Sequence, residues 1–146
     1  MASTPDFTTI PRVTFRELTI TGGRLTAVNH NGAGIAGFLA DVVLDRARVT
    51  ANQTAGRGGG VALVGGSVDA ERAVLAFNGA ALGSAVYSST SQSSSDLRQS
   101  SIYLNGNTAG GNSSVLVENG TALIENSTVA ANSSPNGIAG VTAFTT

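Results

Sequence analysis

The chain repeats a short pattern about every 25 to 29 residues from Leu18 onward. Each copy closes on an asparagine that follows an aliphatic residue by three positions, and successive closing asparagines are 26, 29 and 25 residues apart. These closing residues are Asn52, Asn78, Asn107 and Asn132. A period of this length is typical of a solenoid, in which each repeat forms one coil and stacks on its neighbours. The repeat therefore constrains the architecture more than any other feature of the chain.

Alignment of the copies on their closing residue gives three apolar columns. The column three residues before the close contains Ile20, Val49, Leu75, Leu104 and Val129. The column ten residues before the close contains Val13, Val42, Val68, Leu97 and Ala122. The third column opens each later coil and contains Ile35, Val61, Val86, Val115 and Ile138. Because side chains alternate along a strand, three apolar columns predict three short strands per coil, each with one face inside.

The sequence thus predicts an all-β chain that forms a single-stranded parallel β-helix, or β-solenoid, of about five coils. We expect residues 13–146 to form the β-helix domain, and residues 1–12 to be an N-terminal segment that can fold across the first coil as a cap. The third full coil is about four residues longer than its neighbours in this alignment, and its excess falls in the serine-rich stretch 88–95. That stretch is predicted to be a polar loop that bulges from the stack.

Composition excludes several classes of protein. The net charge is −1 and the eight basic residues, all arginines, are scattered, so no basic patch indicates nucleic-acid binding. No stretch approaches the roughly 18 apolar residues of a membrane span. The N-terminus lacks the basic and apolar regions of a secretory signal, so we expect either a cytoplasmic protein or a mature or trimmed segment. The absence of cysteine excludes disulfides, thiolate metal sites and a cysteine nucleophile.

Three phrases, at residues 18–23, 52–61 and 126–132, carry a family resemblance. They resemble the repeats of right-handed parallel β-helix proteins of the pectate-lyase-like superfamily, above all those of polymorphic outer-membrane proteins and autotransporter passengers. The resemblance covers about residues 13 to 142 and implies a right-handed coil and an extracellular or cell-surface location. Such coils serve adhesins, polysaccharide lyases, hydrolases and phage tail proteins alike, so the resemblance does not select a function.

The resemblance also implies a role for the closing asparagines. In such β-helices an asparagine at the same bend of each coil hydrogen-bonds through its amide to the copies above and below. We therefore expect Asn52, Asn78, Asn107 and Asn132 to form a structural ladder at the ~4.8 Å spacing of neighbouring strands.

Acidic residues seven positions before the close give the one candidate site. That column contains Arg16, Asp45, Glu71, Ser100 and Glu125. Asp45 and Glu71 should stand on adjacent rungs, with Arg46 and Arg72 beside them. Such a carboxylate pair could bind Ca²⁺ or act as acid and base. The arrangement equally suits a solvated charge ladder in which arginines offset the like charges, and we favour this interpretation. We expect no catalytic residue, no metal and no cofactor.

Three functions remain open, in descending order of support. The first is a non-catalytic structural or adhesive module that contacts another protein or itself. We expect its uncapped C-terminal coil, residues 138–146, to pair with another copy, with a partner protein or with the next coil of a longer parent protein. The second is a domain that binds or cleaves a polysaccharide, as a lyase or glycoside hydrolase, although the family's acid motifs and tryptophan are absent. The third is an ice-binding solenoid, for which the threonine rank that begins at Thr19 and Thr21 is soon interrupted.

Overall fold

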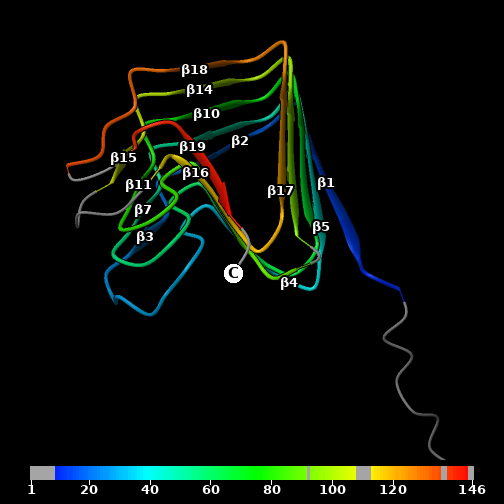
Figure 1. The fold of residues 1–146 in the computed structure, drawn as a ribbon, viewed down its shortest axis with the longest axis horizontal. Helices are drawn as coiled ribbons and strands as arrows, with labels where there is room; N and C mark the ends of the chain where they lie inside the picture. Colours follow the sequence, from blue (N-terminus) through cyan, green and yellow to red (C-terminus); the bar gives the residue numbers. More distant parts are fainter. Residues whose placement is uncertain (1–8, 92, 108–112, 136–137, 145–146) are drawn as a thin grey trace, which may run out of the picture.

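The computed structural model describes residues 9–91, 93–107, 113–135 and 138–144, and these form five coils of a parallel β-solenoid. Figure 1 shows the coils stacked, with β2, β10, β14 and β18 along one side and β1, β5 and β17 along another. All pairing between the strands is parallel, and no helix occurs among the described residues. The predicted all-β solenoid of about five coils is therefore confirmed.

Each coil contributes one strand to each of three sheets, and each of the first four coils also contributes one to a fourth sheet. The sheets are named here by their first strands. The β1 sheet contains β1 (Arg12–Arg16), β5 (Asp41–Asp45), β9 (Ser67–Glu71), β13 (Ser94–Arg98) and β17 (Thr121–Glu125). The β2 sheet contains β2 (Thr19–Thr21), β6 (Arg48–Thr50), β10 (Val74–Ala76), β14 (Ser101–Tyr103) and β18 (Thr128–Ala130). The β3 sheet contains β3 (Arg24–Leu25), β7 (Gln53–Thr54), β11 (Gly79–Ala80) and β15 (Gly106–Asn107). The β4 sheet contains β4 (Ile35–Phe38), β8 (Val61–Val64), β12 (Val86–Ser89), β16 (Val115–Glu118) and β19 (Val141–Phe144).

The prediction of three strands per coil was too low by one short strand. The additional β3 sheet consists of strands of two residues, and in the fifth coil it is represented by a single bridge from Gly106 to Ser133. Strands this short carry at most one inward side chain, so they leave no apolar column of their own in the sequence. Apolar columns in the sequence therefore could not predict the β3 sheet.

The interior is a set of aliphatic columns that run through the stack. In the β2 sheet the register aligns Ile20, Val49, Leu75, Ile102 and Val129. In the β4 sheet it aligns Ile35, Val61, Val86, Val115 and Val141. In the β1 sheet it aligns Phe15, Leu44, Ala70, Leu97 and Ile124. Burial of each such side chain contributes roughly 1.5–3 kcal/mol, and the three middle coils bury theirs almost completely.

The predicted register was wrong by two residues in the fourth coil. Ile102, not Leu104, aligns with Leu75, whereas Leu104 is 46% exposed at a bend where its φ is 53°. Ser95, not Leu97, continues the column of Val68. In the last coil Val141 takes the place predicted for Ile138, which is exposed. The error has a local cause, because the residue before each closing asparagine lies at a left-handed bend and points away from the core. Ala51, Phe77 and Ala131 have φ between 52° and 57° at this position, and Leu104, which precedes Asn105, occupies it in the fourth coil.

The predicted loop at residues 88–95 was also wrong. Ser88 belongs to β12, while Ser94 and Ser95 belong to β13, so the described residues that lie between these strands are Thr90, Ser91 and Ser93. Ser88 and Ser95 are buried, and their hydroxyl oxygens lie 3.1 Å apart. This coil, the fourth of the structure, seemed longer than its neighbours because the sequence alignment closed it on Asn107, two residues too late. Gln92 of this stretch, and residues 1–8 of the predicted N-terminal cap, lie outside the described residues.

Candidate functional site

A column of charged residues runs along the outer face of the β1 sheet, and we call it the charge ladder. The register aligns Arg16, Asp45, Glu71, Arg98 and Glu125. Asp45 and Glu71 therefore stand on adjacent rungs, as predicted. Arg98 occupies the place predicted for Ser100, which is buried instead and accepts a hydrogen bond from the Ala73 amide. The ladder is thus more fully charged than the sequence alignment indicated.

Asp45 is the most enclosed carboxylate of the charge ladder, with a side chain only 14% exposed. Its Oδ2 lies 2.8 Å from Arg16 Nε and 3.5 Å from Arg46 Nη2, and its Oδ1 lies 3.6 Å from Arg72 Nη2. Glu71 is 53% exposed and pairs with Arg72 at 3.1 Å. All four candidate residues of the sequence therefore belong to one ion-pair network, with Asp45 at its centre.

This arrangement limits what the carboxylate pair can do. A cation bound between Asp45 and Glu71 would have to displace the guanidinium groups that already neutralise Asp45. Among the described residues, no cluster of three or more His, Cys, Asp or Glu side chains could hold a metal ion. The hollow beside the pair measures about 300 Å³ and is lined by members of the ladder and, in addition, by Arg12, Val43, Asp69 and Ala70. Surface ion pairs of this kind contribute about 0–1 kcal/mol each.

A second polar column, the asparagine ladder, runs inside the bend between the β2 and β3 sheets. Asn52 Nδ2 donates to Asn78 Oδ1 at 3.1 Å, Asn78 Nδ2 to Asn105 Oδ1 at 3.1 Å, and Asn105 Nδ2 to Asn132 Oδ1 at 3.0 Å. Each of these oxygens also accepts the backbone N–H of the preceding asparagine. The predicted ladder exists, but its third member is Asn105. Asn107 lies in β15 and donates to the Ser113 carbonyl instead.

The asparagine ladder ends at Gly23 in the first coil. The Gly23 amide donates to Asn52 Oδ1 at 2.9 Å, so Gly23 occupies the next position of the column. A Cβ atom at Gly23 would lie 1.9 Å from the carbonyl oxygen of Ala33. The first coil therefore closes on glycine because the chain leading into β4 fills the space that an asparagine side chain would need.

A buried tyrosine cluster on the outer face of the β4 sheet was not foreseen. The Tyr87 side chain is 1% exposed and packs with Ala62 and Leu116. Its hydroxyl donates to Glu118 Oε2 at 2.6 Å and accepts from Arg57 Nη1 at 2.7 Å. Burial and the neighbouring Glu118 carboxylate raise the pKa of Tyr87, which keeps the phenol neutral. No sequence signal marks this cluster, because its three polar members come from different coils.

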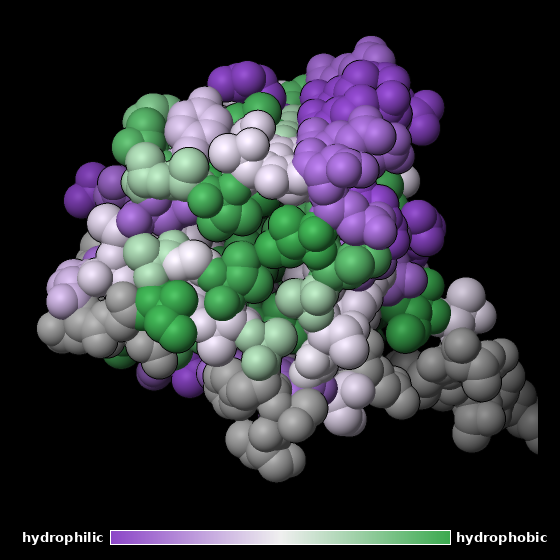
Figure 2. All heavy atoms as spheres, turned by 45° about the horizontal axis from the view of Figure 1, so that its top comes forward, coloured by the Kyte–Doolittle hydropathy of each residue, from purple (hydrophilic) through white to green (hydrophobic). Residues whose placement is uncertain are grey.

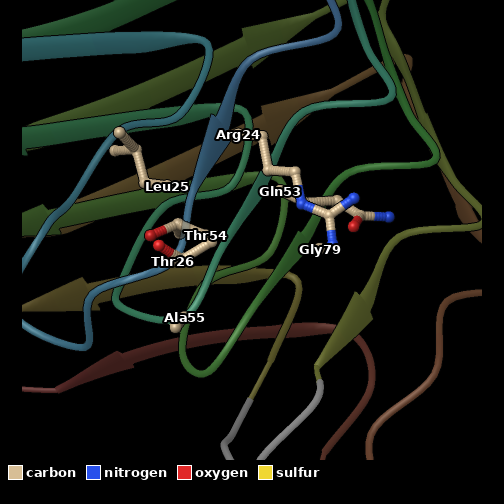
Figure 3. A pocket seen from close by; sticks show the side chains of 7 residues that line it. All are labelled: Arg24, Leu25, Thr26, Gln53, Thr54, Ala55 and Gly79. Atoms are coloured by element: carbon tan, nitrogen blue, oxygen red, sulfur yellow. The ribbon is translucent and has the colours of Figure 1, made fainter.

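A separate hollow of about 290 Å³ lies over the β3 sheet. Figure 3 shows the Arg24 and Gln53 side chains extending in the same direction near Gly79, with Thr26 and Thr54 further along the hollow. The lining combines these polar side chains with the apolar Leu25 and Ala55, and it contains no aromatic side chain. It offers hydrogen-bonding groups without a surface on which a sugar ring could stack.

The last coil leaves part of the interior uncovered. Ala122, Ile124, Val129 and Val141 pack against the core yet are only partly buried, whereas their counterparts in the middle coils are fully enclosed. Figure 2 is turned so that the side of the molecule where β18 lies comes forward, and hydrophobic side chains gather in the middle of that face beside a hydrophilic margin. The outer strands β17, β18 and β19 each pair with another strand on one side alone.

No family model, curated protein or solved structure matches the chain. The resemblance to the pectate-lyase-like superfamily and to outer-membrane-protein repeats accordingly stays an expectation based on three short phrases. Within the described ranges, no helix has the length and apolarity needed to cross a membrane.

Proposed function

We propose that this chain is a non-catalytic structural or adhesive β-solenoid that makes protein–protein contacts through the C-terminal end of its stack. A surface or extracellular location is part of the proposal and rests on the repeat phrases alone. The open end supplies the chemistry for such a contact, because a strand edge with unpaired backbone groups pairs readily with another strand. We therefore propose that the C-terminal end is the binding surface and that the coils form the scaffold that presents it.

One observation carries the proposal, namely the contrast in burial along single columns. Val49, Leu75 and Ile102 are fully buried, whereas Val129, next in the same column, is partly exposed. Apolar surface that the middle coils bury is thus presented to solvent by the last coil. Covering it would gain roughly 25 cal/mol for each Å² removed from water.

Sedimentation velocity over a wide concentration range tests the proposal. We expect the wild-type chain to associate as concentration rises, and Val129→Asp to remain monomeric because it places a charge on the uncovered interior. Thr128→Asp is the matched control, since it adds the same charge at the neighbouring, exposed position of β18. A monomer at every concentration, with both variants behaving like the wild type, would contradict the proposal. Far-ultraviolet dichroism and thermal melting confirm that each variant is folded.

Polysaccharide binding or cleavage is the weaker alternative. Tyr87 is buried and offers no stacking face, and the partly exposed Tyr103 ring already meets the Phe77 ring edge-on, with centroids 5.8 Å apart. A panel of polysaccharides, scored for binding and for released product, tests this function. Turnover that disappears in Asp45→Asn or Glu71→Gln would replace our proposal with a catalytic role for the charge ladder.

Ice binding has less support still. The register sets Thr19 beside Arg48 and Thr21 beside Thr50, and the next rung contributes Val74 and Ala76. The outer face of the β2 sheet therefore lacks the regular rank of threonines that this function needs.

A further inference from the structure

We infer that the occupant of the C-terminal end is the first coil of a second copy of this chain, stacked head to tail in the register of the solenoid. This inference rests on the proposed function and adds the identity and orientation of the partner. It follows from comparing what the last coil exposes with what the first coil exposes.

The first coil leaves interior positions uncovered just as the last coil does. Val13 is 45% exposed, and Phe15 and Ile20 are partly buried members of the core. In one further step of the same register, Val13 of the second copy would lie over Ala122, Phe15 over Ile124 and Ile20 over Val129. Each of these junctions joins apolar residues, so three interior columns would continue across the interface.

The charge ladder would continue across the same junction with favourable sign. Its last residue is Glu125, and the residue that the second copy would place next is Arg16. Glu125 pairs with Arg98 at 3.0 Å and is 52% exposed, while Arg16 pairs with Asp45 at 2.8 Å and is 65% exposed. Both groups therefore keep free faces, and an arginine can serve a carboxylate on each side of its planar fork. The order of charges matches what head-to-tail contact requires.

The asparagine ladder would not continue, and this limits the strength of the contact. Within the chain each ladder asparagine donates to the oxygen of the next asparagine, but the second copy would place Gly23 above Asn132. Asn132 Nδ2 would keep its bond to the Ile102 carbonyl and gain no new acceptor. The interface would thus be weaker than an internal rung, and we expect association to be reversible and dependent on concentration.

Head-to-tail contact differs in geometry from contact between two C-terminal ends. A two-fold contact would reverse the strand direction and could not continue the parallel columns. Head-to-tail contact is heterologous and does not close, so it generates open linear assemblies. Each added copy would lengthen the stack by five rungs, or roughly 24 Å at ~4.8 Å per rung.

Two variants that block opposite ends test the orientation. Val13→Asp blocks the head, and Ala122→Asp blocks the tail at the position that Val13 would meet. We expect each variant alone to sediment as a monomer, and an equimolar mixture to form a 1:1 dimer through the one unblocked head and the one unblocked tail. Thr14→Asp and Leu123→Asp are the matched controls, because they introduce the same charge at neighbouring outward positions of β1 and β17.

The outcomes separate this inference from the proposed function. A Val13→Asp chain that associates by itself, or a mixture without a dimer when the wild type does associate, overturns the head-to-tail inference and leaves the C-terminal contact standing. A wild type that never associates overturns both.

A charge exchange gives a second readout if a blocked end fails to fold. Arg16→Glu and Glu125→Arg should each weaken association about five-fold by placing like charges at the junction, and the double variant should recover most of the loss. A double variant as weak as the single variants would show that these residues do not meet, which overturns the proposed register.

Discussion

The asparagine ladder and the charge ladder are both polar columns with the period of the coil, yet their surroundings are opposite. Asn52, Asn78 and Asn105 are at most 1% exposed, and each satisfies its neighbour inside a bend. Charge-ladder members such as Glu71 remain about half exposed and form their ion pairs at the solvent-facing surface. Exposed ion pairs gain little because water competes for both groups, whereas a buried amide left without a partner pays its full desolvation cost.

The contrast shows that periodicity alone does not indicate how much a column contributes to the stability and register of the coils. The buried column fixes the register of the coils, because a slipped asparagine would leave donors unpaired. We expect the exposed column to tolerate changes of residue, because its arginines and carboxylates are solvated and no buried group depends on them. Substitutions in the buried column should therefore cost more stability than substitutions in the exposed one.

Asn78→Ala should be the most damaging of these changes. Removal of its amide leaves the Asn52 backbone N–H and the Val49 carbonyl without the bonds they now make. At about 1–3 kcal/mol for each buried group left unpaired, the free energy of unfolding should fall by about 2–6 kcal/mol. Urea denaturation measures the loss. The control is Gln53→Ala at an exposed position of β7, which should change stability by less than about 0.5 kcal/mol. Equal losses of stability for Asn78→Ala and Gln53→Ala would mean that the asparagine ladder contributes no more than an exposed residue.

Ile102→Ala against Leu104→Ala tests the register that places the asparagine ladder at Asn105. Ile102 is fully buried and its truncation should cost about 2–5 kcal/mol. Leu104 projects from a bend, so its truncation should cost less than about 1 kcal/mol. Thermal melting of the two variants checks both values. The reverse order would restore the alignment on Asn107.

These two residues also show why the sequence predicted most of the fold but not all of it. Ile102 precedes Asn105 by three residues and Leu104 precedes Asn107 by three, so both pairs satisfy the repeat. Only burial distinguishes them, and burial depends on where the chain bends. In the second and third coils no such rival exists, and the neighbouring rungs of Asp45 and Glu71 were predicted correctly.

The tyrosine cluster lay beyond prediction for a related reason. Tyr87 occupies an outward position of β12, which the alternation of the strand would leave exposed. Its burial depends on turns that the apolar columns do not describe, and its partners Arg57 and Glu118 belong to other coils. Contacts between coils that do not repeat leave no periodic trace in the sequence.

Tyr87→Phe tests a polar group that is buried like Asn78 but bonded to charged partners. Loss of its hydrogen bonds to Glu118 and Arg57 should lower stability by about 1.5 kcal/mol at neutral pH. Because the native pKa of Tyr87 is raised, the unfolded phenol ionises first as pH rises above about 10, and the native state then loses stability. The wild type should therefore weaken on alkaline titration more steeply than Tyr87→Phe. Tyr103→Phe, used as the control, should leave the alkaline loss in place.

Asp45→Asn and Glu71→Gln compare two members of the charge ladder that differ in burial. Asp45 is enclosed by three arginines, so its neutralisation leaves Arg16, Arg46 and Arg72 without their shared counter-charge and should cost about 1 kcal/mol. Glu71 has Arg72 as its close partner and is largely solvated, so its neutralisation should cost less than about 0.5 kcal/mol and relieves the repulsion from Asp45. Urea denaturation at low and high salt measures both, and the difference should shrink as salt screens the network. A larger loss of unfolding free energy for Glu71→Gln than for Asp45→Asn would contradict this prediction. The more exposed carboxylate would then stabilise the coils more, so burial would not determine how much each charge contributes.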